Sequence, residues 1–178
     1  MAEEYTGSTG EPEQAAPSQA RGFAQNVTGE NVQFGPGFAV SVQAGQNVEI
    51  SQAGALAAVA GQDLSVSYGG ALVQVAGGDV QINNGGAQMM LVGGDATLHN
   101  GGAQVMLTGG DVSVTNGGGL LLAGQSVTTQ QGSFGIVLTP QMNLGEGSKV
   151  LMDTRQALLF GAAFGAVFGL LSLLLRRK

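Results

Sequence analysis

The strongest constraint on the fold is a repeat of sixteen residues. GGDVQINNGGAQMMLV at residues 77–92 is followed directly by GGDATLHNGGAQVMLT at residues 93–108, with glycine pairs at the same places. Self-similarity at a fixed period indicates an architecture in which each unit packs on its neighbours. We number positions 1–16 from the first glycine of each unit. Seven units, one of them a residue short, end at residue 139 and open at Gly29, Gly45, Gly61, Gly77, Gly93, Gly109 and Gly124.

Both halves of a unit carry the alternation of a β-strand. Apolar residues occupy positions 4 and 6 of the first half, as in Val80 and Ile82. The second half also alternates, and we read Ala87, Met89 and Leu91 as its inward residues. A period of two predicts a strand with one buried face. The glycine pairs between the halves predict tight corners, where glycine supplies positive φ at little steric cost.

Two architectures fit this pattern. In a β-solenoid each unit is one coil, and equivalent residues stack about 4.8 Å apart. In an antiparallel β-meander each Asn-Gly would be a hairpin turn. We favour the solenoid because the two halves differ consistently and identity returns only after sixteen residues. It predicts an amide ladder along Asn84, Asn100 and Asn116. It also predicts an interior column at position 6, formed by Phe34, Ile50, Val66, Ile82, Leu98 and Val114.

The sequence therefore predicts an all-β, glycine-rich solenoid of about seven coils at residues 22–144, with other segments on either side. Residues 1–21 are rich in Glu, Pro, Ser and Gln, which predicts a disordered tail. A linker at residues 145–156 leads to residues 157–175, an uncharged run long enough for one transmembrane helix. Residues 176–178 form a basic tail.

The predicted membrane helix has recognisable ends and one small-residue face. Asp153 or Thr154 is expected to cap its start. Glycines at four-residue spacing would allow a second helix to approach closely; they are Gly161, Gly165 and Gly169. The basic residues that flank the end of the span are Arg176, Arg177 and Lys178.

A column of acidic and amide side chains occupies position 3. Calcium binds several oxygen ligands, and the glycine-rich β-solenoids of the repeats-in-toxin family bind it. That family's pattern is GGxGxDxUx, and GGDVQINN differs in spacing and lacks the fourth-position glycine. We therefore expect no metal site and prefer Asx turns at a corner. The column consists of Asn31, Asn47, Asp63, Asp79, Asp95, Asp111 and Ser126.

Nothing in the sequence indicates an enzyme. The chain has no cysteine and one histidine, His99, which lies at position 7 without a second histidine or an orienting acid nearby. The glycine pairs precede strands rather than helices, so they match no phosphate-binding or dinucleotide motif. We expect no catalytic residue and no cofactor. The net charge of −6 also argues against nucleic-acid binding by the β-domain.

The predicted outward side of the second half is apolar. If Met89 points inward, the residues on either side of it in the strand point outward, and many of the equivalent residues in other units are apolar. Large apolar patches on a protein surface usually mark contact with a partner. We therefore predict a self-association strip formed by Leu56, Leu72, Met90, Val92 and Met106.

A stiff β-rod with an apolar side and one C-terminal anchor suggests a building element. In its short glycine-rich repeats and flexible ends it resembles the bactofilins, polymer-forming bacterial β-helices. We expect a single-pass, tail-anchored structural protein that associates with itself and with a lipid membrane. The membrane would be a cell membrane or the internal membrane of a virion, where a capsid or other protein shell would be a further partner. The alternatives are a surface-displayed binding or adhesion module and, more weakly, a calcium-binding repeat protein.

Overall fold

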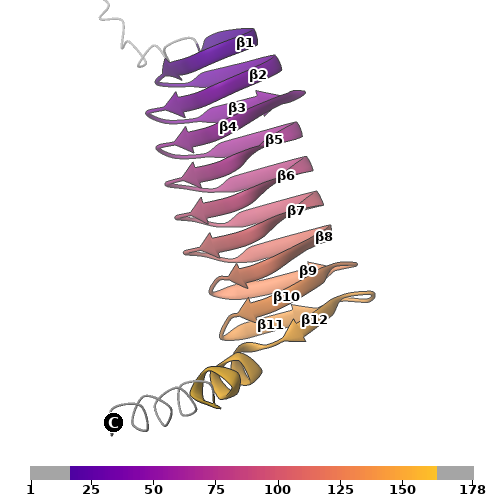
Figure 1. Cartoon of the computed structure of the whole chain (residues 1–178). Coiled ribbons are helices and arrows are strands. Elements are labelled where there is room, and N and C mark those ends of the chain that lie inside the picture. The colour runs from indigo at the N-terminus through magenta and orange to yellow at the C-terminus, as the bar shows by residue number, and fades with distance from the viewer. Residues whose placement is uncertain (1–16, 164–178) are drawn as a thin grey trace, which may run out of the picture.

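The computed structural model describes residues 17–163 and shows one stack of β-coils, followed by a short helix at its foot (Figure 1). Its twelve-stranded sheet contains β1 (Ser18–Gly29), β2 (Val32–Ala44), β3 (Val48–Ser51), β4 (Ala53–Ala60), β5 (Leu64–Ala76), β6 (Val80–Val92), β7 (Ala96–Thr108), β8 (Val112–Ala123), β9 (Ser126–Gln130), β10 (Ser133–Leu138), β11 (Gln141–Leu144) and β12 (Lys149–Met152).

Every strand pairing between successive coils is parallel, and in the central coils its register follows the repeat. In β5 and β6, Leu64 lies beside Val80 and Ala76 lies beside Val92, sixteen residues further along the chain. The same register joins β6 to β7. This confirms the β-solenoid and rules out the antiparallel meander, since a meander would pair neighbouring halves in opposite directions. The stack has about eight turns.

The solenoid extends beyond the predicted boundaries at both ends. β1 begins at Ser18, inside the predicted tail, and forms a further coil that pairs with β2 along its length. At the other end, β12 lies inside the predicted linker and pairs with β10. These end coils lack the glycine pairs of the central units, so the repeat does not reveal them. Residues 1–16 of the predicted tail lie outside the described residues.

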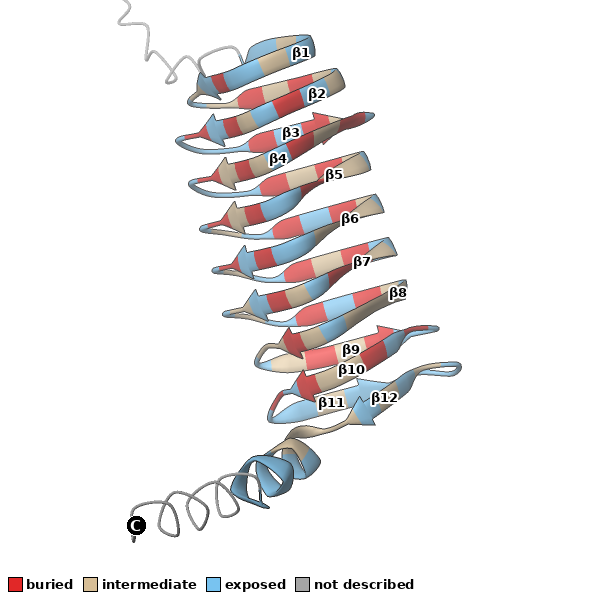
Figure 2. Cartoon of the chain, viewed as in Figure 1, coloured by how far each residue is buried: buried red, intermediate tan, exposed pale blue. Residues whose placement is uncertain are grey.

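Apolar columns along the axis form the core. Buried residues recur at the same places in successive coils, as Figure 2 shows for β5 to β8. The predicted interior column at position 6 is confirmed: its members are at most 1% exposed. Inward side chains also occupy positions 4, 11, 14 and 16 in the central coils.

The alternation changes parity in the second half of each coil, where positions 12 and 13 both face outward. In β6, Gln88 and Met89 are exposed, whereas Met90 and Val92 are buried. Beyond this pair β6 continues with the opposite alternation. The inward residues in this part of β6 are therefore Met90 and Val92, so the prediction that Met89 and Leu91 point inward is wrong.

Asparagines, not glycines, adopt the left-handed conformation at the corner. Position 8 has positive φ, with values of 58° at Asn84, 53° at Asn100 and 53° at Asn116. The amide Nδ2 of Asn100 donates to Oδ1 of Asn84 at 3.2 Å, and Asn116 donates to Asn100 at 3.1 Å. The predicted amide ladder is thus confirmed. Short polar asparagine tolerates this conformation better than most residues.

The glycine pairs allow the backbones of neighbouring coils to approach each other closely. A Cβ on Gly101 would collide with the carbonyl oxygen of Gly85 in the preceding coil. A Cβ on Gly102 would collide with the carbonyl oxygen of Gly118 in the following coil. Gly101 and Gly102 therefore both exclude a side chain, because the neighbouring backbones occupy the space that it needs.

Three polar side chains of the described residues are buried in the core, namely Gln74, Thr129 and Thr139, and Gln74 is the largest of them. Gln74 is fully buried at position 14, in register with Ala58 and Met90. Its Nε2 donates to the carbonyl oxygen of Gly86 at 3.4 Å, but its Oε1 has no hydrogen-bond partner. A buried acceptor without a partner costs free energy that an apolar side chain of similar shape would not.

We expect Gln74→Met to raise the free energy of unfolding by about 1–2 kcal/mol, because it removes this unpaired oxygen. Methionine already occupies position 14 in the next two coils, as Met90 and Met106. Thermal unfolding followed by circular dichroism would measure the change, with Gln88→Met at an exposed position as the control. An unchanged melting temperature for Gln74→Met would mean that Oε1 is already hydrated or bonded in solution.

The helix at the foot of the solenoid starts at Thr154. Asp153 caps it: the backbone N–H of Gln156 donates to Oδ1 of Asp153 at 2.8 Å, and the N–H of Asp153 donates to Oε1 of Gln156 at 3.3 Å. Within residues 17–163 we find no helix with the length and apolar character that crossing a membrane requires. The predicted span at 157–175 continues past residue 163 and so lies largely outside the described residues.

Candidate functional surfaces

The acidic column at position 3 forms a ladder between coils. The backbone N–H of Asp79 donates to Oδ1 of Asp63 at 2.9 Å, and the next two aspartates, Asp95 and Asp111, repeat this bond at 2.8 Å. We expected Asx turns, which would bond within one coil. The carboxylates of Asp63, Asp79 and Asp95 instead accept from the following coil, so each of these three side chains joins two coils.

The glycine at position 2 belongs to this ladder. A Cβ on Gly94 would occupy the place of Oδ1 of Asp79, and the same relation holds between Gly110 and Asp95. A side chain there would displace the carboxylate from the N–H that it accepts. The GGD signature is therefore explained by packing between coils: the first glycine admits a neighbouring backbone, and the second admits a neighbouring carboxylate.

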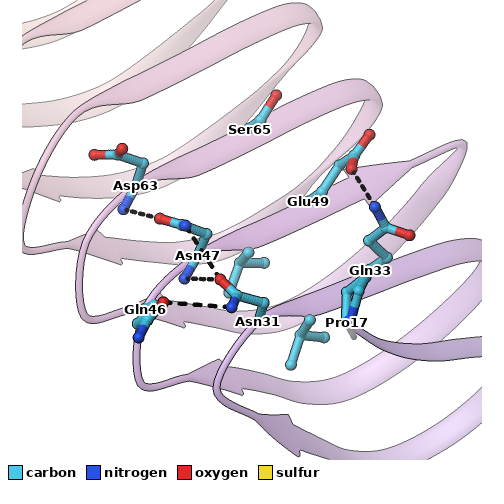
Figure 3. Close-up of a pocket in the computed structure, with 10 residues that line it drawn as sticks. Pro17, Asn31, Gln33, Gln46, Asn47, Glu49, Asp63 and Ser65 are labelled. Atoms are coloured by element: carbon cyan, nitrogen blue, oxygen red, sulfur yellow. Dashed lines mark hydrogen bonds between the residues drawn. The ribbon is translucent and has the colours of Figure 1, made fainter. Parts of the chain in front are cut away.

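A polar groove of about 520 Å³ lies at the N-terminal end of this column (Figure 3). Its side chains bond mainly to one another. Nδ2 of Asn31 donates to Oε1 of Gln46 at 3.3 Å, and Nε2 of Gln33 donates to Oε2 of Glu49 at 3.1 Å. Nδ2 of Asn47 donates to Oδ1 of Asn31 at 3.1 Å. These bonds hold neighbouring coils in register rather than leaving several groups converging on a ligand.

The residues that the structure describes form no cluster of metal ligands. No group of three or more His, Cys, Asp or Glu side chains in residues 17–163 could hold a metal ion. His99 is exposed and lies in register with Asn83 and Thr115, as the repeat predicts. Its neighbours in the column are thus polar side chains without an acid to orient it.

A second surface is apolar throughout. In the second half of each coil, positions 13 and 15 point outward on one sheet face, and parallel pairing aligns them from coil to coil. We call this surface the apolar face. From the coil of β4 to that of β10 it contains no polar side chain, and its members are Ala57, Val59, Val73, Val75, Met89, Leu91, Val105, Leu107, Leu121, Ala123, Ile136 and Leu138.

The predicted self-association strip lies on the correct half of each coil but is partly buried. Leu56 and Leu72 are exposed at position 12, at the edge of the apolar face. Met90, Val92 and Met106 are core residues, at most 5% exposed, so the prediction that they lie on the surface is wrong. The true outward residues here include Met89, Leu91 and Leu107, which are 36–43% exposed.

Of the helix residues predicted to matter, only one lies within the described residues. Gly161 is exposed, and a Cβ built on it would meet nothing within 4 Å. The other two glycines of the predicted packing face, Gly165 and Gly169, lie outside the described residues. So do the basic residues Arg176, Arg177 and Lys178.

Comparison of the chain with protein-family models, with curated proteins and with solved structures gives no significant match.

Proposed function

We propose that the protein is a membrane-anchored structural element that associates with itself through its β-solenoid. The observation that carries this proposal is the apolar face. Most of a soluble solenoid's outer surface is expected to be polar, and the outward positions 3, 5 and 7 of the first half largely follow that rule. An extended sheet face with only apolar side chains is a feature of interaction surfaces.

A second copy of the chain is the partner that fits this face best. The face is regular, with equivalent side chains about 4.8 Å apart along the axis. Another solenoid of the same kind presents apolar side chains at the same spacing. Two such faces can interdigitate as two sheets do in a sandwich, about 10 Å apart. An irregular partner would match this spacing only in places.

The C-terminal helix supports the membrane part of the proposal. Leu158 and Leu159 are 68% and 72% exposed, in a helix that packs little against the solenoid. The sequence continues without a charge from residue 157 to residue 175, and three basic residues follow. Such a run is suited to a hydrocarbon environment. The protein would then build an array on a cell membrane or between a virion membrane and its shell.

Charges on the apolar face test self-association. We expect Leu91→Lys with Leu107→Lys to weaken assembly by roughly 100-fold or more, because each lysine would be buried without a partner. Both side chains are partly exposed, so the coils should remain folded. Sedimentation velocity of the full chain in detergent at several concentrations would measure the oligomer size.

The matched control places the same charges on the polar side of the same two coils. Gln81→Lys with His99→Lys adds two lysines at exposed positions 5 and 7, and the oligomer should be unchanged. Equal behaviour of the two double variants would exclude the apolar face as the interface. A wild-type chain that stays monomeric at every concentration would overturn self-association altogether and point to a foreign partner.

A further inference from the structure

The core of the solenoid is open at its C-terminal end. The last coil contributes Met142 and Leu144 from β11 and Val150 from β12 to the inward columns, as their register with β9 and β10 shows. Among the described residues, no strand pairs with β11 beyond β9, or with β12 beyond β10. Leu144 is consequently 50% exposed, whereas its equivalent in the preceding coil, Thr129, is fully buried.

Further apolar side chains surround this open end. Leu151 in β12 is 80% exposed, and the first turns of the helix add Leu158 and Leu159. We call Met142, Leu144, Val150 and Leu151 the end surface. An open solenoid end exposes both core side chains and unpaired backbone groups, so it needs a cover.

Basic side chains lie near the end surface. Lys149 and Arg155 are exposed beside it, and the only other lysine or arginine in residues 17–163 is Arg21, in the first coil. Two acids are also present. Asp153 is engaged in the helix cap, and Glu146 lies in the turn between β11 and β12. Exposed leucines with basic neighbours match the boundary between lipid headgroups and acyl chains.

The helix leaves the last coil without a flexible connection. β12 ends at Met152, and the helix begins at Thr154 at the foot of the stack (Figure 1). Oγ1 of Thr154 accepts from the N–H of Thr139 at 2.9 Å and lies 3.0 Å from the carbonyl oxygen of Thr139, to which it can donate. The environment of Leu158 and Leu159, whether lipid or water, is therefore close to the last coil as well.

We infer that the lipid surface itself covers the open end: the last coil rests on the bilayer that the helix enters, with Leu144 and Leu151 at the acyl boundary and Lys149 and Arg155 among the headgroups. This inference rests on the proposed membrane anchor. The chain beyond the described residues fits it, because residues 164–175 are uncharged and continue the apolar run of the helix. The solenoid would then stand at a fixed angle on the membrane, and its apolar face would be held ready for a neighbour.

Single cysteines in the full chain test this arrangement, because the protein has none of its own. Leu144→Cys, Leu151→Cys, Leu159→Cys and Gln81→Cys would each carry an environment-sensitive fluorophore. The chains would be reconstituted into phosphatidylcholine–phosphatidylglycerol vesicles that contain nitroxide-labelled lipids. We expect fluorophores at residues 144 and 151 to be quenched several-fold more strongly than the fluorophore at residue 81, which lies in the middle of the polar side. Their quenching should approach the quenching at residue 159.

The quenching pattern distinguishes docking of the last coil on the bilayer from anchoring by the helix. Strong quenching at position 159 with none at 144 and 151 would overturn the docking of the last coil and leave the anchor intact. No quenching at position 159 would overturn the anchor and the inference with it. A blue shift at 144 and 151 that depends on protein concentration, without lipid quenching, would show that a second copy covers the end. Leu151 is so exposed that its variant should fold even if Leu144→Cys does not.

Discussion

Met90→Lys should unfold the central coils, whereas Met89→Lys should leave them folded. The two residues are neighbours of the same type in β6, but Met90 is fully buried and Met89 is 43% exposed. A lysine at position 90 would lie between Gln74 and Met106 in the core, with no acid to pair with it. Burial of an unpaired ammonium, together with the lost packing, costs about 5 kcal/mol or more, which is comparable to the whole stability of many domains.

Circular dichroism melts of the two variants would measure this contrast. Met89→Lys should shift the melting temperature little, because the lysine reaches solvent from the apolar face and its stem still covers apolar surface. It should, however, weaken self-association. If Met89→Lys unfolds the protein and Met90→Lys does not, then the second half of the coil has the opposite parity and the apolar face described above is the core.

The repeat itself predicted the fold well. In a parallel stack, equivalent residues must lie beside one another, so a sixteen-residue period fixes the register without further information. This is why the column from Phe34 to Val114 and the ladder of Asn84, Asn100 and Asn116 could be read directly from the sequence. The same logic placed His99 beside Asn83 and Thr115.

The orientation of the second half could not be predicted in the same way. Runs such as MMLV at residues 89–92 are apolar at both parities, so alternation does not say which side is inward. Gln74 added a false signal, because a glutamine at position 14 suggests an outward place, yet it is buried. The decisive feature is the pair of consecutive outward residues, such as Gln88 and Met89, and no glycine or proline marks this pair in β6.

The function of the GGD signature was also hidden in the sequence. Aspartate after glycine is typical of a turn, and an Asx bond within one coil was the natural expectation. The bond from Oδ1 of Asp79 to the N–H of Asp95 joins residues sixteen apart, so it becomes apparent only when the coils are stacked. The repeat spacing could have suggested it, because an amide or carboxylate at position 3 recurs from Asn31 to Asp111.

Gly70→Ala and Gly54→Ala should have opposite effects on stability, although both glycines occupy position 10. A Cβ on Gly70 would collide with the carbonyl oxygen of Gly86 in the next coil. The two coils would have to separate and lose hydrogen bonds, and we expect a loss of roughly 3 kcal/mol. A Cβ on Gly54 would meet only ordinary contacts, 3.4 Å from Cδ2 of Phe38 and 4.0 Å from the carbonyl oxygen of Gly70.

Gly54→Ala should therefore stabilise the protein by about 0.5–1 kcal/mol, since alanine reduces the entropy of the unfolded chain. Chemical denaturation of the two variants beside the wild type would give both free energies. Equal effects would mean that the glycine pairs serve only as flexible corners. Opposite signs would show that they set the distance between coils, and hence the spacing of the apolar columns that a neighbouring solenoid must match.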